Sequence, residues 1–128
     1  MTREQAIMRL FFVPGLGART ISRILRRLAV EERELLEFME APPDELVHEY
    51  GLPEDAARRV GKANAESDEL CDQLSEHDIA MVDIGRTRYP ALLAARLGRT
   101  APPVLFVRGN VDLLYSPTVA IVGSRQSS

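Results

Sequence analysis

Apolar residues recur at helical spacing throughout the first 78 residues. Thr2 begins the first expected helix with the pattern of a capping box, and Ile7, Leu10 and Phe11 share its apolar face. Proline and glycine interrupt the pattern several times. We therefore expect five helices, with approximate limits at residues 2–12, 18–28, 31–40, 43–48 and 53–77. The last would be the longest, with inward positions at Ala57, Val60, Asn64, Ser67, Leu70, Cys71 and Leu74.

The pattern changes after Asp78 to short apolar runs that are rich in β-branched residues. Such runs predict strands, here at residues 79–84, 104–107 and 118–122. Between the first two runs, Pro90 would occupy the first position of a short helix. The last run has no polar alternation, which is typical of a parallel strand covered by helices on both faces. We expect a small helical domain over residues 1–78, then the first strands of an α/β domain over residues 79–128, in the N-terminal portion of a longer protein.

Composition narrows the classes of protein to consider. Apolar residues make up 45% of the chain and charged residues 27%, as in ordinary globular proteins. One cysteine and two histidines supply neither a disulfide framework nor a metal centre, so we expect no metal and no cofactor. No apolar run approaches the roughly 18 residues of a membrane helix, and the N-terminus lacks a secretory pattern. The sequence predicts a cytoplasmic protein without membrane contact.

Charge is strongly segregated along the chain, although the net charge is only −3. Residues 1–30 and residues 84–128 each carry +5, whereas residues 31–55 carry −9 and residues 56–83 carry −4. Two basic regions on either side of an acidic one indicate that a polyanion would bind locally rather than over the whole surface.

The first candidate site is the turn Pro14-Gly15-Leu16-Gly17, which leads into the second helix. Gly15 and Gly17 permit close approach of another backbone, and a helix N-terminus suits a phosphate group. Arg19 and Arg23 lie, with Arg26 and Arg27, opposite the apolar face of that helix. The pattern resembles the helix-hairpin-helix motif of DNA-binding proteins. A tight turn beside a solvated arginine face explains it equally well. A second hairpin around residues 51–53 lies among acidic residues and is expected to be structural only.

The second candidate site follows the apolar run that ends at Val122. A buried parallel strand would deliver Gly123, Ser124 and Arg125 to the carboxyl edge of its sheet, where open α/β sheets bind ligands. The hydroxyl can donate to a phosphate oxygen, and the guanidinium can bind phosphate through two nitrogens. A glycine after a strand is common, so this motif alone is a weak signal.

Three segments in order resemble the DNA-processing protein A family, also called DprA or Smf. They are Arg88-Tyr89-Pro90-Ala91-Leu92-Leu93, then Ala101 to Asn110 followed by Leu113-Leu114, and then Val119 to Arg125. The resemblance is specific over residues 88–125 and looser over residues 1–78. It implies a helix-hairpin-helix or SAM-like helical domain before a Rossmann-like DNA-binding domain, of which residues 79–128 would be the incomplete start.

The resemblance implies a protein without catalytic residues that binds single-stranded DNA and helps to load the recombinase RecA during natural transformation. Gly123, Ser124 and Arg125 would lie in its phosphate pocket. The turn and helix described above supply Gly15, Gly17, Arg19 and Arg23 as candidates for a secondary DNA contact. The complete protein would form a homodimer through its Rossmann-like domain, whereas the fragment could stay monomeric. The alternatives are a Rossmann-type nucleotide-binding enzyme, similar to phosphoribohydrolases, and a helical module for protein contacts. The sequence alone does not decide whether the helical domain binds DNA or protein, or whether the host takes up DNA.

Overall fold

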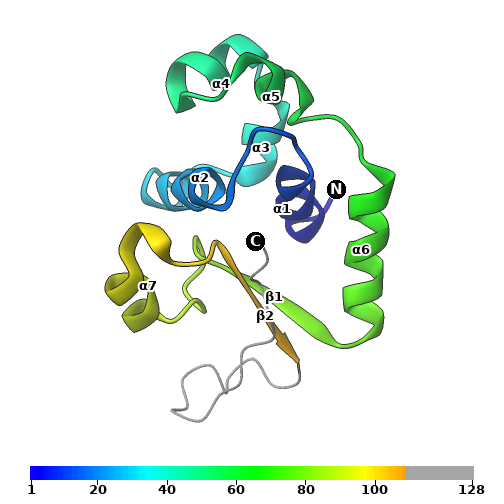
Figure 1. Cartoon of the computed structure of the whole chain (residues 1–128), viewed down its shortest axis with the longest axis vertical. Coiled ribbons are helices and arrows are strands. Elements are labelled where there is room, and N and C mark those ends of the chain that lie inside the picture. The colour runs from blue at the N-terminus through cyan, green and yellow to red at the C-terminus, as the bar shows by residue number, and fades with distance from the viewer. Residues whose placement is uncertain (109–128) are drawn as a thin grey trace.

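The N-terminal helices form where their caps and apolar faces predict them. The computed structural model describes residues 1–108 (Figure 1). Helix α1 spans Arg3–Phe11, and its capping box joins Thr2 and Gln5 reciprocally, with N–H···O distances of 3.1 and 2.9 Å. Helix α2 spans Ala18–Val30 and buries the expected face, including Ile21, Ile24 and Leu25.

The third helix begins later than its sequence pattern predicts. Helix α3 spans Leu35–Glu40, not residues 31–40. The reason is the end of α2, where Glu32 adopts a φ of +53° and the N–H of Arg33 donates to the carbonyl of Leu28 at 2.9 Å. This left-handed closure satisfies the last carbonyls of α2 and uses residues 31–34 as a connection.

Helix α4 spans Pro43–Tyr50, close to the expected limits. The prediction of a single long helix over residues 53–77 is wrong, because two helices form there: α5 spans Glu54–Arg59 and α6 spans Ala65–Glu76. The break occurs at Gly61, where a Cβ atom would lie 2.7 Å from the carbonyl oxygen of Met39. Asn64, expected to point inward on a continuous helix, instead caps α6 by accepting from the N–H of Ser67 at 2.9 Å.

Two short strands follow the helices and pair with each other. Strand β1 spans Ile79–Asp83 and β2 spans Val104–Arg108, and they are antiparallel, with Met81 opposite Phe106. Between them lie α7, Ala91–Leu97, which Pro90 precedes as N-cap, and a 3-10 turn, Gly98–Thr100. The described residues therefore form a mostly helical α+β structure. The parallel strand expected at residues 118–122 lies outside them.

One hydrophobic cluster joins the helices to the strands. It contains residues on both sides of position 78, the expected domain boundary. Helix α6 packs against α1 and leads into β1, and the 3-10 turn contacts α2 (Figure 1). Within residues 1–108, every helix is too short or too polar to cross a bilayer. The most completely buried large side chains are Ile7, Leu10, Ile21, Ile24, Leu25, Leu35, Leu46, Leu52, Val60, Val104, Leu105 and Val107.

Tyr89 anchors the segment before α7 and gives a pH-dependent prediction. Its hydroxyl donates to the carbonyl of Pro102 at 2.7 Å, and burial raises the pKa of the phenol to about 12. Since an unfolded tyrosine has a pKa of about 10, the protein is stabilised below pH 10, and this stabilisation is lost as the pH rises toward 12. The free energy of unfolding should fall by about 1.4 kcal/mol more between pH 9 and 11 than in Tyr89→Phe.

Urea titrations followed by circular dichroism at each pH measure this difference. The other two tyrosines titrate in both proteins and cancel in the comparison. Parallel pH profiles for the two proteins would show that the phenol of Tyr89 ionises as readily in the folded state as in the unfolded one.

Candidate functional site

The turn between α1 and α2 has the backbone that its glycines predict. Gly15 adopts a φ of +94°, a region that L side chains rarely occupy. Gly17 is the extended N-cap of α2, and a Cβ atom there would meet nothing within 4 Å. The turn therefore leaves open space at the start of α2, where the first N–H groups of a helix lack helical acceptors.

The arginines of α2 divide by the partners they hold. Arg27 donates to Glu31 at 3.0 Å, lies 4.3 Å from the ring centroid of Tyr50, and lowers the pKa of the Glu31 carboxyl through this hydrogen bond. Arg23 donates to the carbonyl of Tyr50 at 3.1 Å. Carbonyl groups carry no net charge, so the charge of Arg23 remains available to an anion.

Arg26 and Arg19 also differ in their hydrogen-bond and ion-pair partners. Arg26 donates to the carbonyl of Gly98 at 3.0 Å and so ties α2 to the 3-10 turn. Arg19 is exposed beside the N-terminus of α2, and no ion pair within residues 1–108 includes it. The structure thus brings Gly15, Gly17 and Arg19 to one end of α2, with Arg23 one turn further along.

The second hairpin joins α4 to α5 through Gly51, whose φ is +68°. Arg58 on α5 pairs with Glu54 at 2.8 Å and also with Asp55. These neighbours neutralise the cation, so this hairpin offers less positive charge than the first.

A basic groove that the sequence analysis missed lies beside the first hairpin. It has a volume of about 320 Å³ and is lined by residues from the end of α1 and from the α5–α6 connection, among them Arg9, Arg59 and Lys62. An unbroken helix over residues 53–77 would have kept Lys62 within regular helix. Two local signals of the break were present in the sequence: Gly61, and Asn64, a favoured N-cap residue that caps α6.

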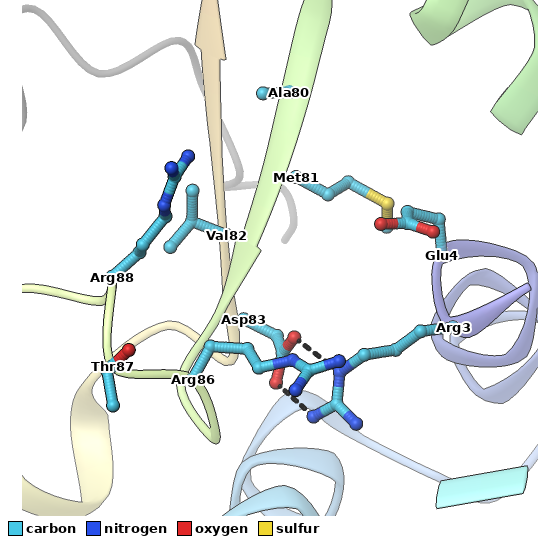
Figure 2. A pocket seen from close by; sticks show the side chains of 9 residues that line it. All are labelled: Arg3, Glu4, Ala80, Met81, Val82, Asp83, Arg86, Thr87 and Arg88. Carbon is cyan, nitrogen blue, oxygen red and sulfur yellow. Dashed lines mark hydrogen bonds and ion pairs between the residues drawn. The ribbon is translucent and has the colours of Figure 1, made fainter. Parts of the chain in front are cut away.

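A second pocket, of about 350 Å³, lies between α1 and β1 (Figure 2). Arg3 reaches from α1 to Asp83 at the end of β1 and donates to both carboxylate oxygens, at 2.9 and 2.8 Å. Asp83 is 4% exposed, and it also accepts from the N–H of Gly85 at 3.1 Å. The hydrogen bonds to Asp83 raise the pKa of Arg3. Arg86, Arg88 and Glu4 also line the pocket, so three arginines face two carboxylates.

Neither Arg3 nor Asp83 was singled out from the sequence. The two residues are 80 positions apart, and no local pattern links them. Among residues 1–108, no group of three or more His, Cys, Asp or Glu side chains is placed to hold a metal ion.

Gly123, Ser124 and Arg125 lie outside the described residues. Residues 80–128 match the family model of DNA recombination-mediator protein A. This confirms the family resemblance for the C-terminal part of the chain. The match begins within β1 and includes β2 and Gly123–Arg125. Searches of curated proteins and of solved structures gave no match.

The DNA recombination-mediator protein A match connects this region with DNA recombination and, in general terms, with partners related to DNA. It does not include residues 1–79, which contain the first hairpin and the basic groove.

Proposed function

We propose that this protein is a non-catalytic recombination mediator that binds single-stranded DNA and helps to load RecA onto it during DNA uptake. The observation that carries the proposal is the family match over residues 80–128. The basic character of residues 84–128, with six arginines and one acidic residue, supports a polyanionic ligand for the same region.

The main phosphate contact is assigned to Gly123, Ser124 and Arg125. A glycine lets the DNA backbone approach, and a hydroxyl and a guanidinium bind phosphate oxygens. The second contact is the hairpin turn with Gly15, Gly17, Arg19 and Arg23. Its open N-terminal end and the uncompensated charges of Arg19 and Arg23 support that role.

The remaining parts of the proposal follow from the family. The protein would act in the cytoplasm. Its Rossmann-like domain would form the homodimer and contact RecA. A nucleotide-processing enzyme would need a carboxylate or imidazole that can reach the ligand. The pocket between α1 and β1 has two carboxylates in its lining, Glu4 and Asp83, and that of Asp83 is occupied by Arg3.

Fluorescence anisotropy with a labelled single-stranded oligonucleotide at two salt concentrations tests the function. We expect salt-dependent binding that Arg125→Ala weakens by about tenfold, because a bidentate phosphate contact is lost. Arg19→Ala should weaken it by only about threefold, since this guanidinium is a solvent-exposed secondary contact. Arg58→Ala, which removes an exposed arginine already paired with Glu54 and Asp55, is the matched control.

The outcomes separate the candidate functions. If Arg19→Ala has the larger effect, the main contact lies at the hairpin. Binding of mononucleotides alone would favour the nucleotide-binding enzyme. A chain that binds neither ligand would be a helical module for protein contacts.

A further inference from the structure

The basic groove beside the first hairpin combines positive charge with an exposed aromatic ring. Its lining residues are Arg9, Phe12, Val13, Pro14, Arg59, Lys62, Ala63 and Asn64. We propose that this groove binds a nucleotide segment of single-stranded DNA, with a base stacked on Phe12 and the backbone phosphates at Arg59 and Lys62. The proposal rests on the proposed function and adds a contact outside the region that matches the family.

The charge of the groove is positive and largely uncompensated. Within residues 1–108, no carboxylate lines it, although Asp68 accepts from the lining residue Arg9 at 3.2 and 2.9 Å. Arg59 and Lys62 are exposed, and the ion pairs found within residues 1–108 include neither of them. Three cations against one anion leave two positive charges for a ligand.

Phe12 selects among anionic ligands. Its side chain is 36% exposed at the C-cap of α1, next to Phe11, which is 37% exposed, whereas Ile7, Met8 and Leu10 of this helix are buried. Of these two exposed rings, only that of Phe12 lines the groove described within residues 1–108. Aromatic rings beside cations are the usual means by which proteins hold single strands, because every base has a face that can stack. An acidic peptide would satisfy Arg59 and Lys62 but would leave the ring without a partner.

The walls of the groove are fixed before any ligand binds. The two hydrogen bonds from Arg9 to Asp68 hold α1 against α6. Gly61 packs its backbone close to Met39, and Asn64 caps α6. Residues on both sides of Lys62 are therefore held in place. The protein backbone loses little conformational entropy when single-stranded DNA binds.

The groove also adjoins the hairpin contact along the chain. Pro14 lines the groove and immediately precedes Gly15. A strand that leaves the groove past Pro14 would reach the open N-terminus of α2 and Arg19. The two contacts would then form one continuous path rather than two separate sites.

Anisotropy titrations of the full chain with labelled oligo(dT) test the groove. The double variant Arg59→Ala/Lys62→Ala should weaken binding by about tenfold at low salt and reduce the slope of log K against log salt by about 1.4, two phosphate contacts on a single strand. Arg58→Ala, which removes an exposed cation already paired with Glu54 and Asp55, is the matched control and should change little.

Phe12 is tested by Phe12→Leu, which keeps an apolar side chain and so protects the fold. It should weaken oligo(dT) binding by about tenfold without changing the salt slope, and Phe12→Tyr should restore binding. Circular dichroism verifies that each variant has the secondary structure of the parent chain.

Three results would overturn the proposal. If oligo(dT) binds the parent chain and the groove variants behave like Arg58→Ala, the groove is not a contact while the proposed function stands. If the parent chain binds no single-stranded DNA, both fail. If poly-glutamate displaces oligo(dT) at equal charge concentration and Phe12→Leu has no effect, the groove is a site for acidic peptides.

Discussion

Leu105→Ala is expected to lower the free energy of unfolding by about 3 kcal/mol, because it leaves a cavity in a close-packed core. Leu105 is 1% exposed on β2, opposite Val82, and belongs to the hydrophobic cluster that also contains Ile21 and Leu25 of α2. Since this cluster spans both sides of residue 78, the helices should unfold together with the strands. Urea denaturation followed at 222 nm should show one transition at a lower midpoint with an unchanged slope.

The matched control is Leu92→Ala on α7. Leu92 is 64% exposed, so its removal should change the free energy of unfolding by no more than about 0.5 kcal/mol. If Leu105→Ala instead produces two transitions, with the helical signal retained in the second, residues 1–78 fold independently of residues 79–108. That result would support the domain boundary expected from the sequence.

Much of the helical part could be predicted because its determinants are local. The capping box at Thr2, the glycines of the first turn and the apolar face of α2 act within a few residues of one another. The late start of α3 followed from a local left-handed closure at Glu32, whereas a distant contact decided the break between α5 and α6. No residue near Gly61 in the sequence indicates that Met39 will lie against it. The prediction relied on the periodicity of apolar residues and therefore joined α5 and α6 into one helix.

The candidate sites were predictable to different degrees for the same reason. The candidate site at the first hairpin lies within residues 14–23 and was visible in the sequence. The basic groove depends on α1 and the α5–α6 connection meeting in space, and the pocket between α1 and β1 depends on a pair 80 residues apart. The β-branched runs correctly predicted β1 and β2, but they did not reveal that the two strands pair antiparallel.

The Arg3–Asp83 pair should be the most important polar contact between the helices and the region that matches the family. The two side chains are 21% and 5% exposed, and Arg3 donates to both carboxylate oxygens. Arg3→Met keeps most of the apolar stem but leaves a buried carboxylate whose one remaining hydrogen-bond donor within residues 1–108 is the N–H of Gly85. We expect a loss of about 3 kcal/mol in the free energy of unfolding.

A double-mutant cycle isolates this interaction from the other effects of each substitution. Arg3→Met, Asp83→Ala and the double variant should give a coupling energy of about 2 kcal/mol by urea denaturation. Arg58→Met, the control, breaks ion pairs whose side chains are 52%, 77% and 84% exposed. It should cost less than about 0.5 kcal/mol, because solvent screens exposed pairs.

If the coupling energy is no larger than the cost of Arg58→Met, hydrophobic packing alone holds β1 against α1. A coupling near the expected value would instead mean that Arg3 helps to orient β1, where the family match begins, and so links the N-terminal helix to the region connected with DNA recombination.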